Sequence, residues 1–366
     1  MNDPASYDFT LTDVYLQAMV DAGTEPFYRL GSKIEHWVKK YDTLPPPDPM
    51  KWARICEHII RHYNEGWADG FHWNIRYWEI WNEPDLDRDD SPNKRCWGGT
   101  EAQFHELFRI TATHLKKCFP NLKIGGPAVA GNKPWTRRFL ADMAGDGKNS
   151  RVPMDFFSWH VYAVDPMETA NGARVYRKLL DEYGYTETEN ILNEYNYVRG
   201  WSDDWIYSIE QMIGIKGAIF TASCMCACQS SPLDILMYYD ARPCAMNGMF
   251  DFYTLRARKC YYPFLAFAEL RDLGTQVAMT NDVPNVFTLA ATDGKGAFGT
   301  MICVYADDDS DREPREIELT VNGSDFADMR CRILDEDKNL EEVPIEMNGN
   351  RAKLTLAPNS MAFISR

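Results

Sequence analysis

The sequence lacks the features that mark several common classes of protein. It holds no run of about 18 consecutive apolar residues, so we expect no membrane insertion. The first ten residues, MNDPASYDFT, contain neither a basic nor an apolar segment, so we find no signal peptide in this sequence. The compartment stays open: the chain would be cytoplasmic, or periplasmic or secreted if a leader had been removed. The sequence also has no Gly-rich phosphate loop and no Gly-x-Ser-x-Gly motif.

Positive charge is scarce. Lys and Arg together number 39 against 54 Asp and Glu, which gives a formal net charge of −15. Such a surface argues against partners that are themselves negative, so we expect no nucleic acid and no anionic membrane surface as partners. The charge suits a soluble enzyme that acts on a neutral substrate.

The ten cysteines form no Cys-x-x-Cys pair. One cluster occurs, at positions 224, 226 and 228, and no histidine lies close to it in the sequence. Its spacing differs from that of zinc and redox sites. We therefore expect reduced thiols that pack as small hydrophobic side chains, which favours a reducing compartment.

Strand and helix patterns alternate over the first 274 residues. Six short apolar runs, each ended by polar residues, Gly or Pro, predict strands near 25–29, 77–82, 122–126, 155–160, 190–194 and 234–239. Helical periodicity marks 11–22, 50–66, 101–118, 135–145, 171–184, 205–223 and 260–274, and Thr100 is the expected N-cap of the helix at 101–118. Such alternation predicts a parallel sheet.

We expect this α/β region to be a (β/α)8 TIM-type barrel. The two catalytic candidates described below follow strands, and the active sites of such barrels lie at the C-terminal ends of the strands. With six strands found, the barrel would be N-terminally short by about two strands. Residues 275–366 instead hold short alternating strands separated by turn signals, which predict a C-terminal antiparallel β-sandwich. We thus predict a catalytic domain over 1–274 and an accessory domain over 275–366.

Glu83 is the first candidate for chemistry. The strand at 77–82 leads into it and Pro84 ends the strand, so its carboxyl group would lie at the C-terminal mouth of a buried strand. Trp78 and Trp81 precede it closely. A half-buried carboxyl group lined by aromatic rings can have its pKa raised towards about 6, which suits a general acid that protonates a leaving-group oxygen.

Glu194 is the second candidate. It follows the same pattern as Glu83, since an apolar strand runs into Asn193 and the glutamate and an aromatic residue comes next. The two glutamates are 111 positions apart, or about three strand-helix units, and strands three apart face each other across a barrel mouth. If so, the carboxyl groups would lie about 5–5.5 Å apart, which is the separation of a retaining glycosidase.

Trp81-Asn82-Glu83-Pro84, together with Asn193-Glu194-Tyr195, resembles the clan of retaining (β/α)8 glycoside hydrolases. Within that clan, the stretches AGTEPFYRLG, YWEIWNEPD and DFFSWHVY most resemble family 39, the β-xylosidase and α-L-iduronidase family. The resemblance implies that Glu83 is the acid/base and Glu194 the nucleophile. It also makes the strand near 25–29 the family's third, in agreement with two missing strands.

The resemblance implies further substrate-binding residues. Asn82 would bond the sugar 2-hydroxyl, and His160 and Tyr162 would lie beside the nucleophile. Tyr238 or Tyr239 would stand where the clan usually has a tryptophan as the floor of the sugar subsite. His36 and Trp37 would form subsite walls.

No metal and no cofactor is expected in this reaction, which needs two carboxyl groups and water. An acidic loop at 85–90 is either a solvated loop or a Ca²⁺ site, although its spacing is not that of an EF-hand. The function expected is the retaining hydrolysis of an oligo- or polysaccharide, β-xylosidase-like by resemblance. The alternative is a non-catalytic carbohydrate-binding protein on a degenerate glycosidase barrel. The sugar, the linkage, exo or endo action and the oligomeric state stay open.

Overall fold

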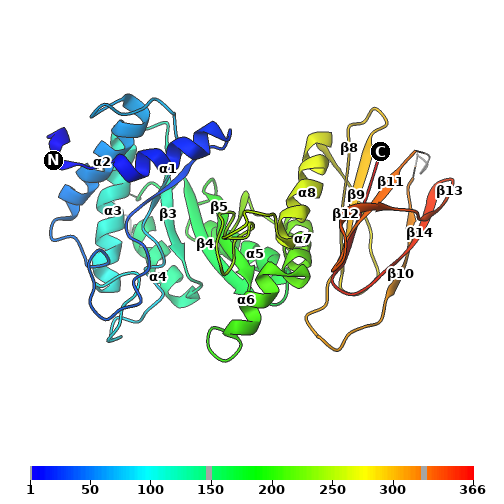
Figure 1. Cartoon of the computed structure of the whole chain (residues 1–366). Helices are drawn as coiled ribbons and strands as arrows, with labels where there is room; N and C mark the ends of the chain where they lie inside the picture. Colours follow the sequence, from blue (N-terminus) through cyan, green and yellow to red (C-terminus); the bar gives the residue numbers. More distant parts are fainter. Residues whose placement is uncertain (1, 146–150, 323–327) are drawn as a thin grey trace. The chain divides into compact units, whose positions relative to one another are not determined.

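The structure is a computed structural model that describes residues 2–145, 151–322 and 328–366 (Figure 1). The chain packs as two units, the first formed by Met1–His160 and Val175–Asn193 and the second by Val161–Arg174 and Glu194–Arg366. The chain passes from one unit to the other three times. Two of the crossings lie inside strands, between His160 and Val161 and between Asn193 and Glu194, and one lies inside a helix, between Arg174 and Val175. The domain boundary expected at residue 274 stays a prediction, although the secondary structure does change from α/β to all-β there.

Six strands form one sheet in which their order follows the sequence. They are β1 (Phe27–Leu30), β2 (Tyr77–Ile80), β3 (Lys123–Val129), β4 (Phe156–Ala163), β5 (Glu189–Tyr197) and β6 (Ile235–Tyr238). The pairs β1–β2, β2–β3 and β3–β4 are parallel, and Arg29 of β1 lies opposite Glu79 of β2. The prediction of a parallel sheet and the positions of its six strands are confirmed.

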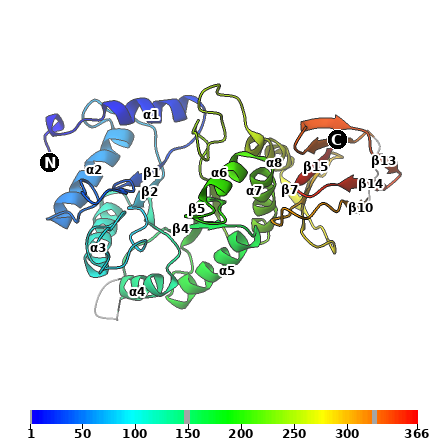
Figure 2. The ribbon, with the colours of Figure 1, turned by 60° about the horizontal axis from the view of Figure 1, so that its bottom comes forward.

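Helices precede, connect and follow these strands. They are α1 (Thr10–Asp21), α2 (Pro49–Glu65), α3 (Glu101–Cys118), α4 (Lys133–Ala144), α5 (Met167–Glu182), α6 (Trp205–Ile213), α7 (Ile215–Cys228) and α8 (Tyr262–Leu273), with short 3-10 helices η1 (Pro4–Ser6) and η2 (Lys259–Tyr261). Thr100 caps α3 as predicted, since its hydroxyl accepts from the amide of Gln103 while the Gln103 side chain accepts from the amide of Thr100. Figure 2 shows α2 and α3 side by side in the first unit.

The core of the first unit is strongly aromatic. Its largest fully buried side chains are Trp78, Trp81, Trp159, Tyr63, Tyr176, Phe104, Phe108, Phe139, Phe156 and Phe157. They come from strands and helices alike, so the sheet and its covering helices share one apolar interior. The burial of these rings is the main source of stability expected for this unit.

The single helix predicted over 205–223 is wrong. The structure has two helices, α6 and α7, which meet at Gly214 with a bend of 72°. Gly214 has extended backbone angles, and a side chain on Gly217 would collide with the carbonyl oxygen of Gln211 at 2.4 Å. The three clustered cysteines, Cys224, Cys226 and Cys228, are buried in α7 as predicted.

No single helix within the described ranges is long and apolar enough to cross a membrane. The bent pair of α6 and α7 reaches the necessary length and composition only when the two are taken together. All but the first residue of α7 is buried in the protein.

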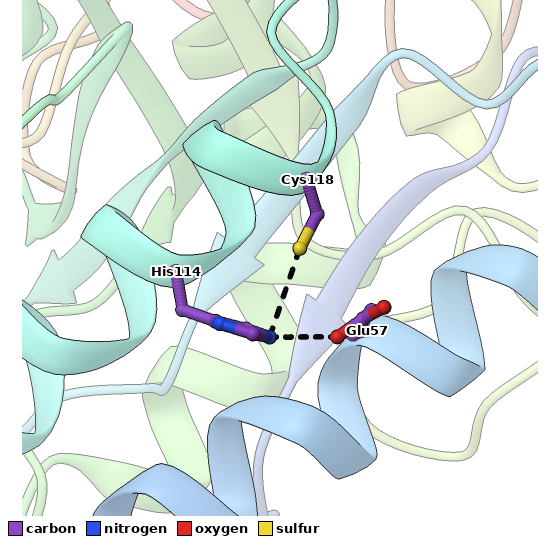
Figure 3. Close-up of side chains that lie close together, drawn as sticks. All are labelled: Glu57, His114 and Cys118. Atoms are coloured by element: carbon purple, nitrogen blue, oxygen red, sulfur yellow. Dashed lines mark hydrogen bonds and ion pairs between the residues drawn. The ribbon is translucent and has the colours of Figure 1, made fainter. Parts of the chain in front are cut away.

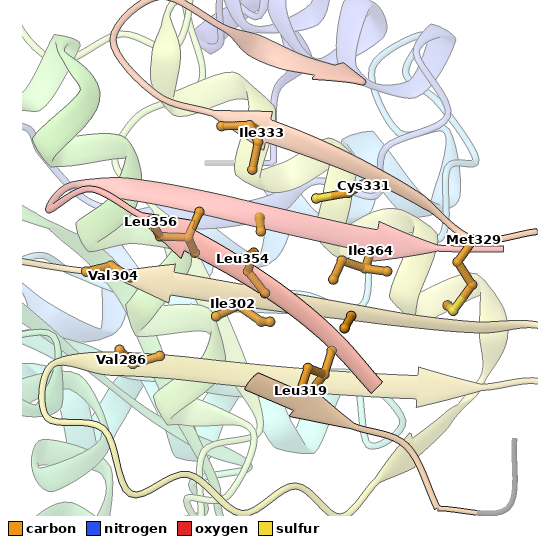
Figure 4. Close-up of a cluster of buried hydrophobic side chains, with 12 residues drawn as sticks. Val286, Ile302, Val304, Leu319, Met329, Cys331, Ile333, Leu354, Leu356 and Ile364 are labelled. Carbon is orange, nitrogen blue, oxygen red and sulfur yellow. The ribbon is translucent and has the colours of Figure 1, made fainter. Parts of the chain in front are cut away.

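The C-terminal part of the second unit is antiparallel. Strands β10 (Arg315–Thr320), β14 (Arg351–Leu356) and β13 (Glu346–Asn348) form one sheet, and β12 (Asn339–Val343), β11 (Arg330–Leu334), β15 (Ser360–Ser365), β9 (Phe298–Val304), β8 (Val286–Thr292) and β7 (Thr275–Val277) form another, in these orders. Buried side chains of both sheets make one core, with Leu319 and Leu354 from the first and Ile302 and Ile364 from the second (Figure 4). The antiparallel β region expected after residue 274 is therefore present.

Candidate active site

Glu83 lies just beyond the end of β2, where the backbone turns sharply. Trp81 and Glu83 have φ angles of 72° and 46°, in the left-handed region that residues other than glycine rarely adopt. Backbone hydrogen bonds hold the turn, because the amide of Trp81 donates to Leu30 at 2.8 Å and that of Glu83 donates to Ala128 at 2.9 Å. Conformations of this kind concentrate at functional sites.

The carboxyl group of Glu83 is held from both sides. Nδ1 of His160 lies 2.8 Å from Oε1, and the thiol of Cys96 donates to Oε2 at 3.7 Å. Nη2 of Arg29 lies 3.4 Å from the other ring nitrogen of His160. Burial raises the pKa of the Cys96 thiol, so it stays protonated and available as a donor. His160, which was expected beside the nucleophile, thus contacts the expected acid/base.

The sequence predicted a raised pKa for Glu83, and this geometry shows that the prediction is wrong. Burial of the carboxyl group would by itself raise its pKa, as the sequence suggested. The hydrogen bond and charge of His160, and the charge of Arg29, outweigh burial and hold the pKa of Glu83 below its ordinary value. The ionised form is therefore favoured in the ligand-free protein.

A buried ionic network lies beneath Glu83. The side chain of Glu79 is 1% exposed and accepts from Nε of Arg29 at 2.5 Å. Its other oxygen accepts from the Ser158 hydroxyl at 2.5 Å and from Nδ2 of Asn193 at 2.7 Å. The network joins β1, β2, β4 and β5, and it fixes the residue that precedes Glu194 in the chain. Sequence reasoning missed it, although charged residues inside two apolar strands were a signal.

Asn82 is buried next to Cys96. Its Nδ2 lies 3.8 Å from the Cys96 sulfur, whereas Oδ1 finds no hydrogen-bond donor among the residues that the structure describes. Leaving a buried carbonyl oxygen unpaired costs roughly 1–3 kcal/mol. Oδ1 is thus a ready acceptor for a hydroxyl group of a ligand.

The acidic loop after Pro84 is ordered by its own side chains. Asp85 is buried and accepts from the amides of Ala130 at 2.7 Å and Asn132 at 2.9 Å. Asp87 pairs with Arg95 at 2.7 Å. Burial raises the pKa of Asp85 to about 6. The expectation of a solvated loop is therefore wrong for Asp85, which ties the loop after β2 to the loop after β3.

Glu194 lies in the second unit with Tyr162. The Tyr162 hydroxyl donates to Oε1 of Glu194 at 2.6 Å, so the pairing implied by the resemblance is present. The Tyr162 ring meets Trp201 edge-on at 4.9 Å, and Trp201 stacks on Trp205 at 5.2 Å with 23° between the planes. Trp201 is 63% exposed. Sequence reasoning did not single out this tryptophan pair.

Tyr239 follows β6, the strand next to β5 in the sheet. Its amide donates to the carbonyl of Tyr195 at 3.2 Å, and its own carbonyl accepts from Nδ2 of Asn196 at 2.7 Å. Tyr238 is the last residue of β6 and meets the ring of the buried Tyr195 edge-on at 5.9 Å. These contacts anchor the backbone of Tyr239 to the strand that carries Glu194.

The remaining predicted residues lie on the loop after β1. Trp37 is 83% exposed, and the carbonyl of His36 accepts from Nδ2 of Asn93 at 3.1 Å. Their role as subsite walls stays a prediction. The structure thus joins Glu83 to His160 in one unit and Tyr162 to Glu194 in the other, and the distance between the two glutamates also stays a prediction.

The sequence is similar to that of known glycosidases. The sequence model of the glycosyl hydrolases family 39 matches residues 2–200. A β-xylosidase of Geobacillus stearothermophilus is 28% identical over 212 residues, which cover 53% of this chain and 37% of that protein. A β-xylosidase of Caldicellulosiruptor saccharolyticus is 27% identical over 172 residues, covering 44% and 32%. The matched stretch thus spans about a third of the length of these curated relatives.

Solved structures share the fold over nearly the whole chain. A glucosidase from Croceicoccus marinus has a TM-score of 0.76 with 24% identity, covering 100% of this chain and 83% of its own. A monomeric β-xylosidase from Caulobacter crescentus has a TM-score of 0.71 with 17% identity, covering 98% and 84%. Since the family model matches more than half of the sequence, the chain belongs to family 39 of the glycosyl hydrolases.

Proposed function

We propose that this protein is a retaining glycoside hydrolase that removes xylose or a related sugar from an oligosaccharide. The observation that carries the proposal is the environment of the two glutamates in a member of family 39. Glu83 ends β2 in contact with His160, and Glu194 accepts a short hydrogen bond from Tyr162. Two carboxyl groups that differ in their surroundings are what an acid/base and a nucleophile require.

The reaction proceeds by double displacement. Glu194 attacks the anomeric carbon while Glu83 gives its proton to the departing glycosidic oxygen, so that the glycosidic bond breaks and a glycosyl ester on Glu194 forms. Glu83 then takes a proton from water, which attacks the same carbon and releases the sugar and the Glu194 carboxylate. The two inversions leave the configuration unchanged. A separation of about 5–5.5 Å between the carboxyl groups is expected.

The pKa of Glu83 fits the two halves of this cycle. In the second half the residue must be ionised to take a proton from water, and His160 and Arg29 favour that form. In the first half it must be protonated. A bound sugar that loosened the contact with His160 would leave burial as the dominant influence, and burial raises the pKa of Glu83.

The substrate class rests on the relatives and on two features of this chain. Both curated relatives are β-xylosidases. The unpaired oxygen of Asn82 would accept a hydrogen bond from the sugar 2-hydroxyl. Trp201 contacts the ring of Tyr162, whose hydroxyl bonds Glu194, and its exposed face offers an apolar platform for a sugar ring.

We further propose that the six parallel strands are six of the eight of a (β/α)8 barrel, and that the antiparallel part is a β-sandwich.

Hydrolysis of a panel of aryl glycosides tests the proposal. We expect one glycoside, an aryl β-xyloside first, to be cleaved by the wild type. Glu83→Ala and Glu194→Ala should each lose roughly 10²–10⁴-fold in rate. The surface variant Glu182→Ala is the matched control and should keep full activity. Added azide should rescue Glu83→Ala and give a glycosyl azide of retained configuration.

The same experiment separates hydrolysis from binding alone. A folded wild-type protein that binds xylo-oligosaccharides but cleaves none of the panel would overturn the hydrolase proposal in favour of a carbohydrate-binding protein. Equal activity of Glu194→Ala and Glu182→Ala would remove Glu194 from the mechanism.

A further inference from the structure

A second cluster of chemically active side chains lies on the helices α2 and α3, apart from the residues described above. Glu57 projects from α2, and His114 and Cys118 project from α3 towards it (Figure 3). His114 and Cys118 are one helical turn apart, which places both on the same face of α3. All three side chains are partly buried.

The three groups converge on one point. Nε2 of His114 lies 2.7 Å from Oε2 of Glu57 and 3.8 Å from the Cys118 sulfur, and all three atoms lie within 4.8 Å of one another. In a tetrahedral zinc site, with bonds of about 2.0–2.3 Å, the ligand atoms lie roughly 3.3–3.6 Å apart. A shift of about half an ångström of the Glu57 carboxylate would make room for an ion.

We propose that Glu57, His114 and Cys118 bind a divalent transition-metal ion of the zinc class and clamp α2 to α3. A thiolate, an imidazole and a carboxylate are ligands that zinc accepts, and a solvent molecule would fill the fourth position. Two ligands four residues apart on a helix, with a third from the neighbouring helix, fix the position of the ion. The proposal does not depend on the glycosidase mechanism.

The nearby positive charge of Arg61 does not block this site. Arg61 binds the other oxygen of Glu57, with Nε 2.9 Å from Oε1, and it also pairs with Glu65. Its charge is therefore shared between two carboxylates, while Oε2 of Glu57 faces His114. Burial and the charge of Glu57 raise the pKa of the Cys118 thiol. An incoming cation would replace the thiol proton, as metal ions do when they bind cysteine.

Titration of chelator-treated protein with Co²⁺, a spectroscopic substitute for Zn²⁺, tests the proposal. We expect saturable binding with the visible bands of tetrahedral cobalt and a near-ultraviolet sulfur-to-cobalt charge-transfer band. Cys118→Ser should abolish the charge-transfer band and weaken binding roughly tenfold or more, whereas Glu57→Gln should keep the band and weaken binding. Cys244→Ser is the matched control, because this partly exposed thiol lies in another part of the chain.

A second measurement tests whether the bound ion stabilises the packing of α2 against α3. Zn²⁺ should raise the melting temperature of the wild type and of Cys244→Ser but not that of Cys118→Ser. The absence of a charge-transfer band in the wild type, or its persistence in Cys118→Ser, would overturn the proposal. Neither measurement uses glycosidase activity. The failure of the metal-site proposal can therefore be distinguished from the failure of the proposed function.

Discussion

Nδ1 of His160 lies 2.8 Å from Oε1 of Glu83, and this contact is a main reason why the pKa of Glu83 stays low despite burial. In His160→Asn the hydrogen bond weakens and the charge is lost, so the pKa of Glu83 should rise. A general acid works only while protonated, and kcat/KM reports the pKa of the free enzyme. The basic limb of the pH profile of kcat/KM should therefore move to higher pH.

The matched control for this prediction is His58→Asn on α2, where the ring bonds the carbonyl of Arg54. That variant should keep the wild-type pH profile. A basic limb that stays in place in His160→Asn, or moves to lower pH, would show that His160 does not set the pKa of Glu83.

Tyr162→Phe removes the 2.6 Å hydrogen bond to Glu194 and keeps the ring against Trp201. Hydrogen bonds to charged groups contribute roughly 1.5–3 kcal/mol, so kcat/KM should fall about 10–150-fold without loss of folding. Kinetics on the cleaved aryl glycoside measure kcat/KM, and circular dichroism shows whether the variant is folded. Tyr15→Phe on the exposed side of α1 should have no effect. An unchanged kcat/KM in Tyr162→Phe would exclude a role for the hydroxyl.

The fold was predictable where local signals were strong. The capping box at Thr100 and the terminal glycine of α2, Gly66, mark helix ends within the sequence itself. The break at Gly214 was missed, because the apolar pattern continues through it and a single glycine is tolerated in helices at a cost of about 1 kcal/mol. The bend brings Gly217 so close to the carbonyl of Gln211 that only glycine fits there, and this tertiary approach is not visible in the pattern.

The site was predictable in its motifs but not in its electrostatics. Glu83 and Glu194 stand out, because each follows a strand and an asparagine. The pKa of Glu83 depends on His160, which is 77 positions away, and the partners of Glu79 depend on the register of parallel strands. Such contacts follow from tertiary packing, so a single sequence does not contain them.

Glu79→Ala should destabilise the protein strongly. The substitution leaves the guanidinium of Arg29 and the groups of Ser158 and Asn193 without their shared acceptor. Removal of one partner of a buried ion pair costs roughly 3–5 kcal/mol. The surface pair of Arg137 and Glu182, 50% and 47% exposed, gives the control, since Glu182→Ala should cost less than about 1 kcal/mol. Urea unfolding of both variants measures the difference, and equal losses would contradict the prediction.

Trp201→Ala tests the proposed sugar platform. Because Trp201 is exposed and stacked on Trp205, its removal should cost little stability. It should raise KM for xylo-oligosaccharides while kcat for a small aryl glycoside changes little. Trp37, which is 83% exposed, serves as a comparison, and Trp37→Ala tells whether the loop after β1 also binds the oligosaccharide. A KM that is unchanged for every substrate length would remove Trp201 from the site.

Asp85 should make the stability of the protein depend on pH in a defined direction. Burial raises the pKa of its carboxyl group from 3.8 to about 6 in the folded protein, so folding favours the protonated form. The corresponding stabilisation is complete below the unfolded pKa and is lost as the pH rises through the folded pKa. The free energy of unfolding should therefore fall by about 2 kcal/mol between pH 4 and pH 7 through this group alone.

Asp85→Asn isolates this contribution, because asparagine does not titrate. The free energy of unfolding of the wild type minus that of Asp85→Asn should decrease over the same pH interval, measured by urea unfolding at each pH. Asp272→Asn, at an exposed position on α8, should show no comparable trend. A difference that is constant with pH would mean that Asp85 has the same pKa in the folded and unfolded chains. In that case, the two amides that it accepts from, those of Ala130 and Asn132, would offset the cost of burying its charge.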